Sequence, residues 1–158
     1  MNRSRLSILS ILVLVWANLV SAQDVLRADR IKSLHGLTAI KLVARPRMDL
    51  EVITMREFFD HVSVLLHQKI PPLKEQEDAN AWLIVEYITT VRGGLVAVSV
   101  YRWAMVSGAQ AMSFVKVWDD HKLILGGGGD IPAYKHMIKD ITEEIITSLA
   151  ADYYRANP

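Results

Sequence analysis

The 158-residue sequence contains no cysteine. Disulfide bonds therefore cannot stabilise the fold, and no thiol is available as a nucleophile or as a metal ligand. The cysteine that would accept a lipid next to a signal-peptide cleavage site is also missing, so we do not expect a lipoprotein. The folded state has to be stabilised by the packing of its core.

The sequence also lacks an excess of charge of either sign, since 18 basic residues are matched by 17 acidic ones. Arg3 and Arg5 belong to an N-terminal segment that we expect to be removed. Their loss leaves 16 basic residues against 17 acidic ones, so the formal charge changes from +1 to −1. A nearly neutral chain has no electrostatic basis for binding nucleic acid.

The N-terminus has the three-part pattern of a secretory signal peptide. Residues 1–5 carry positive charge, residues 6–20 are almost wholly aliphatic, and Val20 and Ala22 are the small residues before Gln23. A helix of about 17 residues spans about 26 Å, less than the roughly 30 Å of a bilayer core, which favours cleavage over a permanent anchor. We expect a signal peptide over residues 1–22, cleavage between Ala22 and Gln23, and a periplasmic or secreted protein. In the alternative, the uncleaved segment holds the protein at the membrane.

Strand-forming residues recur along the rest of the chain. Residues 23–35 form a polar lead-in, and a single domain is predicted over residues 36–158. β-Branched and aliphatic runs predict strands at 37–45, 81–91, 95–106 and 109–118, the first ending at Pro46. The pair Gly93-Gly94 predicts a tight turn between antiparallel neighbours. Asp119 and Asp120 are expected to break or bulge the last strand before it continues at 123–125, and residues 73–80 are a predicted solvated connector.

Two helices are predicted. Thr54 and Glu57 form a capping box at the start of the first, which ends at Pro71-Pro72. Its predicted apolar face consists of Met55, Phe58, Phe59, Val62, Leu65 and Leu66. Asp130 is a plausible N-cap for the long final helix. The predicted buried stripe of that helix consists of Tyr134, Met137, Ile138, Ile141, Ile145, Leu149 and Tyr153.

The order β-α-β-β-β-α predicts an α+β fold. Amphipathic helices need one apolar surface to cover, and a mostly antiparallel sheet of about four strands provides it. We therefore expect a two-layer sandwich with both helices on one face of the sheet.

The C-terminal residues carry a family resemblance. The chain resembles a family of small exported bacterial proteins that have a signal peptide and one α+β domain ending in a long helix. The matching features are Asp152-Tyr153-Tyr154 followed by Asn157-Pro158, Gly94-Leu95 at the start of a central strand, and Trp118 late in the next strand. The chain departs from the family at residues 119–122, where small and hydroxyl residues are expected. The resemblance implies the compartment and the fold, and it implies no activity.

Four consecutive glycines, Gly126 to Gly129, precede the final helix. Backbone N–H groups at a helix N-terminus can bind an anion. However, the run lacks the lysine of a phosphate-binding P-loop, and Asp130 places a negative charge where a phosphate would lie. A flexible connector is the favoured interpretation.

A metal site would need three or four ligands that converge on one point. Asp119, Asp120, His121 and His136 are the candidates, if the final helix passes near the last strand. They support the alternative hypothesis of a small periplasmic hydrolase or metal-dependent enzyme, whose site would include the 126–129 loop. Adjacent polar residues of this kind are more typical of a strand turn. The sequence contains no nucleophile elbow.

Aromatic residues indicate a different function. Tyr101 and Trp103 share one face of a predicted strand, and Trp82 and Trp118 lie on the neighbouring strands. If one sheet face is uncovered, Tyr101, Trp103 and Trp118 would form a binding surface; otherwise they belong to the core beneath the helices. We predict a non-enzymatic binding or accessory module of the cell envelope, without a cofactor, whose partner is another envelope protein or a small apolar ligand.

Overall fold

The computed structural model describes residues 28–48, 50–105, 111–126 and 129–158. The predicted signal peptide, its cleavage site and two of the four consecutive glycines lie outside these residues. The elements, in chain order, are β1 (Ala39–Met48), α2 (Met55–Lys69), β2 (Lys74–Glu75), β3 (Ala81–Thr90), β4 (Gly93–Met105), β5 (Met112–Leu125) and α3 (Ile131–Ala156). A short helical turn at residues 28–32 precedes β1. In this part of the chain no helix is both long enough and apolar enough to cross a membrane.

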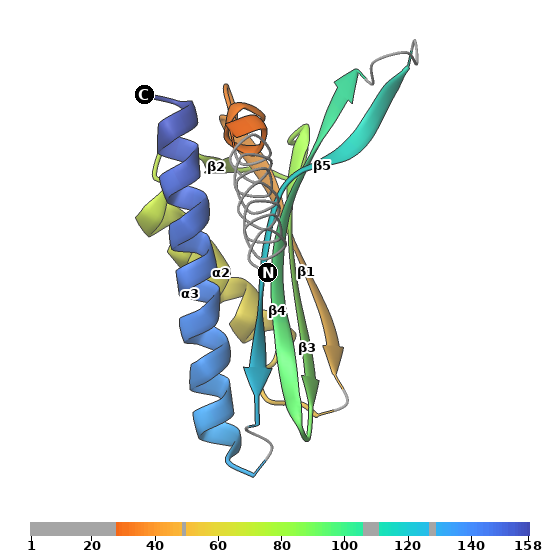
Figure 1. Cartoon of the computed structure of the whole chain (residues 1–158), viewed down its shortest axis with the longest axis vertical. Helices are drawn as coiled ribbons and strands as arrows, with labels where there is room; N and C mark the ends of the chain where they lie inside the picture. The colour runs from red at the N-terminus through yellow and green to blue at the C-terminus, as the bar shows by residue number, and fades with distance from the viewer. Residues whose placement is uncertain (1–27, 49, 106–110, 127–128) are drawn as a thin grey trace, which may run out of the picture.

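The five strands form one mixed sheet in the order β2-β1-β3-β4-β5. β3, β4 and β5 pair antiparallel, and β1 pairs parallel with both β2 and β3. α2 and α3 cover the same face of this sheet (Figure 1). The predicted α+β fold with two helices on one face is confirmed. Two features were not predicted. One is the parallel pairing of β1, and the other is the two-residue strand β2, which lies in the segment predicted to be a connector.

β1 continues through Pro46 to Met48, so the prediction that it ends at Pro46 is wrong. β2 pairs with β1 only at Ala39 and Ile40. Beyond these residues, the outer edge of β1 has no partner strand in the described part of the chain. Proline is tolerated on such an edge because no neighbour needs its missing N–H.

The predicted caps are present at both helices. Thr54 Oγ1 accepts a hydrogen bond from the Glu57 N–H at 3.2 Å, and Asp130 Oδ1 accepts one from the Ala133 N–H at 3.0 Å. The Glu57 carboxylate does not complete the predicted capping box. It forms ion pairs with Lys135 and Lys139 of α3, at 2.6 and 2.7 Å.

The core lies between the sheet and the two helices. Phe58 of α2 packs on Tyr87 of β3 with 4.4 Å between the ring centroids, and the Tyr87 hydroxyl donates to the Ile53 carbonyl at 2.9 Å. Leu34, just after the N-terminal helical turn, is fully buried in the same core. The predicted apolar faces include two residues, Met55 and Met137, that are exposed.

Candidate functional site

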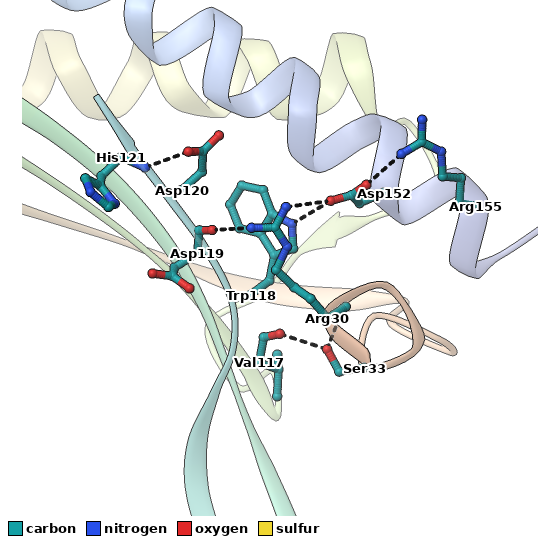
Figure 2. Close-up of polar contacts among 9 residues, drawn as sticks. All are labelled: Arg30, Ser33, Val117, Trp118, Asp119, Asp120, His121, Asp152 and Arg155. Atoms are coloured by element: carbon teal, nitrogen blue, oxygen red, sulfur yellow. Dashed lines mark hydrogen bonds and ion pairs between the residues drawn. The ribbon is translucent and has the colours of Figure 1, made fainter. Parts of the chain in front are cut away.

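Three of the four candidate metal ligands lie on β5, on opposite faces of the strand, and the fourth lies on α3. Asp119, Asp120 and His121 are consecutive residues of a continuous strand, so the break or bulge expected at the two aspartates is absent there. The register of β5 shifts two residues earlier, at Val117. Figure 2 shows Asp120 on the side of α3, and Asp119 and His121 on the other side. Alternation along a strand explains this separation. His136 is exposed on α3, 4.0 Å from Asp140.

These candidates already have partners in the protein. Asp119 forms an ion pair with Lys116 at 3.1 Å, and Asp120 accepts a hydrogen bond from the His121 N–H at 2.8 Å. Among the described residues, no three histidine, aspartate or glutamate side chains are grouped so that they could hold a metal ion. The hypothesis of an enzymatic metal centre at these residues gains no geometric support.

Trp118 is a core residue with 1% of its surface exposed. Its indole Nε1–H donates to Asp152 Oδ2 at 3.1 Å, as Figure 2 shows. Asp152 is also buried and forms ion pairs with Arg30 at 3.2 Å and with Arg155 at 3.0 Å. The Arg30 guanidinium lies 5.2 Å from the centre of the Trp118 ring. Buried carboxylates need such partners because an isolated charge in the core is strongly unfavourable.

The same contacts attach the N-terminal helical turn to β5. The Arg30 guanidinium donates to the Asp119 carbonyl at 2.8 Å, and the Ser33 hydroxyl lies 2.8 Å from the Val117 carbonyl (Figure 2). Sequence reasoning missed this cluster. One signal was available, since Asp152 follows the buried Leu149 by three residues and therefore lies on the same side of α3.

An aromatic cluster lies on the open face of the sheet, the face opposite α2 and α3. It consists of Trp82, Tyr101, Trp103 and Phe114. Phe114 is at its centre, with ring centroids 5.0 Å from Trp82, 5.5 Å from Tyr101 and 5.3 Å from Trp103. No described helix covers this face (Figure 1). Of the three residues predicted as a binding surface, Tyr101 and Trp103 therefore lie together, and Trp118 lies apart from them in the core.

A β-bulge explains why Phe114 joins the cluster. Val100 pairs with Trp118, whereas the next residue, Tyr101, pairs with Lys116, so Val117 is the extra residue. A bulge of this kind shifts the alternation of side chains by one. Trp118 consequently points to the helices, while Lys116 and Phe114 point to the open face. Strict alternation would have placed all three on the same face.

A cavity of about 410 Å³ lies at the end of the sheet, beside the aromatic cluster. It is lined by Gly36, Leu37, Thr38 and Ala39, by Asn80 and Ala81 at the start of β3, and by Arg102, Trp103 and Met112. Arg102 is the one charged residue among those described as lining it. Its guanidinium already donates to the Ser33 and His35 carbonyls, at 2.9 and 3.2 Å. The cavity therefore combines apolar side chains with the polar side chains of Thr38 and Asn80.

No protein-family model and no curated protein matches this sequence. Among solved structures, a PelC dodecamer from Paraburkholderia phytofirmans aligns with a TM-score of 0.40 and 13% identity, over 74% of this chain and 88% of that chain. A minor lipoprotein from Acinetobacter baumannii aligns with a TM-score of 0.29 and 14% identity, over 77% of this chain and 90% of that one. The chain is thus remotely similar in structure to these two proteins, and similarity at this level carries no argument about function.

Proposed function

We propose that this protein is a non-enzymatic binding module of the cell envelope that holds an apolar ligand or partner on the open face of its sheet. The observation that carries the proposal is the aromatic cluster of Trp82, Tyr101, Trp103 and Phe114. Trp103 is exposed and the other three rings are half-buried, on a face that no described helix covers. Apolar patches of this kind usually mark a binding surface.

The exposure of the neighbouring side chains supports this proposal. Trp103 is 49% exposed, and Met105 and Met112 are 67% and 55% exposed beside it. The core does not need these side chains, because α2 and α3 pack on the opposite face. Aromatic rings provide a large apolar contact area, and methionines adapt to apolar partners of varied shape. The predicted signal peptide supports a location in the envelope.

Dye binding tests the proposal on the mature chain that begins at Gln23. The probe is phenylnaphthylamine, an apolar dye whose fluorescence rises when it leaves water. We expect Trp103→Ser and Phe114→Ser each to weaken dye binding about tenfold, which corresponds to about 1.4 kcal/mol. Circular dichroism checks that both variants remain folded.

Val64→Ser is the matched control, because Val64 is an exposed apolar residue on α2, away from the open face. It should leave dye binding unchanged. If Val64→Ser weakened binding as much as Trp103→Ser, or if the mature protein bound no dye, the open face would not be the binding surface.

A further inference from the structure

The edge of β4 is open at one end of the sheet. β3 begins at Ala81, which pairs with Arg102, whereas β4 continues to Met105. Residues 103–105 therefore pair with residues 112–114 of β5 on one side and, in the described part of the chain, with no strand on the other. We call these two segments the β4–β5 arm. In Figure 1 the arm extends beyond the ends of β1 and β3.

The cavity of about 410 Å³ lies at this open edge. Ala81 and Trp103 both line it. Ala81 is the first residue of β3, and Trp103 is the first residue of β4 that no longer pairs with β3. Leu37 and Ala39 form another part of its wall. A chain segment placed beside residues 103–105 would thus contact apolar side chains together with Thr38 and Asn80, and it would lie next to a strand edge that no other described strand pairs with.

The arm also lacks two of the features that can protect an open edge, charged residues and proline. Soluble proteins place charged residues or proline on such edges to prevent pairing with another chain. Residues 103–115 contain neither. The register places Trp103, Met105, Met112 and Phe114 on the same face of the arm. The open edge and the exposed apolar face therefore lie together.

We propose that the open edge of β4 at residues 103–105 accepts an extended, uncharged segment of another polypeptide as an added strand. The inference rests on the proposed function and names its class of partner. Strand addition satisfies the backbone groups of the edge, while side chains of the added strand occupy the cavity. A lipid surface fits less well, because hydrocarbon cannot satisfy the N–H and C=O groups of an open edge.

The test uses an uncharged capped peptide of alternating threonine and valine, added to the mature protein beginning at Gln23. NMR chemical shifts should change at residues 103–105 and at Ala81. A peptide of the same sequence with N-methylated valines keeps its side chains but loses backbone donors. We expect it to bind about tenfold or more weakly, the ratio that the loss of one or two hydrogen bonds produces.

Met105→Lys places a charge at the edge and should weaken binding of the first peptide about tenfold. Leu123→Lys is the control: Leu123 is exposed on the same face of β5, but it pairs with Leu95 far from the arm.

Equal binding of the two peptides, or no binding at about 1 mM, would overturn strand addition while dye binding still supports an apolar surface. If the protein without peptide dimerises, and Met105→Lys abolishes the dimer, the strand that occupies the edge belongs to a second copy of this chain instead. Loss of dye binding in the unmodified protein would remove the proposed function itself.

Discussion

Buried polar side chains are the main single-residue feature of this protein. Asp152 is 2% exposed and joins three donors from three segments: Arg30, Trp118 and Arg155. Such a residue contributes to stability mainly through the cost of leaving its partners unsatisfied. The cluster thus connects the N-terminal helical turn, β5 and α3.

Asp152→Asn tests the contribution of the charge. The amide oxygen can still accept from Trp118, but both arginines then face a neutral group. We expect the free energy of unfolding to fall by about 1–3 kcal/mol, measured by urea denaturation. Asp140→Asn, on the exposed side of α3, should change it by less than about 0.5 kcal/mol. Equal effects of the two substitutions would show that the buried charge is not needed.

Gly94→Ala tests the close approach of α3 to the start of β4. A Cβ at Gly94 would overlap the Tyr134 hydroxyl and the Ile88 carbonyl. We expect thermal unfolding to show a loss of about 2 kcal/mol, typical of an overpacked site. Gly129→Ala is the control, because its Cβ would meet no atom within 4 Å. A Gly94→Ala variant as stable as this control would contradict the packing described for Tyr134.

At the scale of elements, ion pairs connect α2 to α3. Glu57, in the first turn of α2, contacts Lys135 and Lys139, while Lys69 at the other end of α2 pairs with Glu143 at 2.9 Å. Hydrogen bonds from Lys135 and then Lys139 hold the pKa of Glu57 below its ordinary value of 4.5. The two helices are thus paired at both ends of α2 over the face of the sheet.

This shift predicts a dependence of stability on pH. A carboxylate with a lowered pKa stabilises the fold above its ordinary pKa of 4.5, and the contribution is lost as the pH falls through the lowered value. Glu57→Gln should therefore be less stable than the unmodified protein at neutral pH and equally stable in strong acid. Because Glu57 is one-third exposed, we expect a difference of only about 0.5 kcal/mol. Urea denaturation at several pH values measures it, and a difference independent of pH would contradict the assignment.

At the scale of the whole molecule, the N-terminal helical turn packs against the end of α3. The Arg30 guanidinium pairs with Asp152 and brings this turn against α3. His35 Nδ1 donates to the Ala156 carbonyl at 2.8 Å, and the Gly36 N–H donates to Asn157 Oδ1 at 2.8 Å. Removal of residues 1–22 would therefore leave all of these contacts in place.

We predict that the exported protein begins at Gln23. Expression of the full chain in a bacterium, followed by intact mass measurement of the periplasmic fraction, tests this. Ala22→Arg should block cleavage, because the peptidase requires a small residue at that position. A periplasmic product that retains residues 1–22 would favour the membrane anchor instead.

Elements that depend on near neighbours in the chain were predictable. Thr54 and Asp130 cap their helices through N–H groups three residues away, and Gly93 and Gly94 begin β4 directly after a tight turn. Their patterns are visible in the sequence because the interacting groups are close along the chain. The apolar periodicity of α2 and α3 likewise predicted one shared sheet face. The absence of cysteine already required a core stabilised by packing alone.

Features that depend on distant contacts were decided only by the tertiary structure. The bulge at Val117 moves Phe114 to the open face. The Val117 carbonyl accepts a hydrogen bond from Ser33, which is 84 residues away in the chain. The buried Asp152 pairs with Arg30, which is 122 residues away in the chain. A sequence pattern reports the period of a strand or helix, but neither a one-residue shift between strands nor a charge partner far along the chain. The aromatic surface was therefore half predictable: Tyr101 and Trp103 follow from alternation, whereas their contact with Phe114 and the burial of Trp118 follow from the bulge.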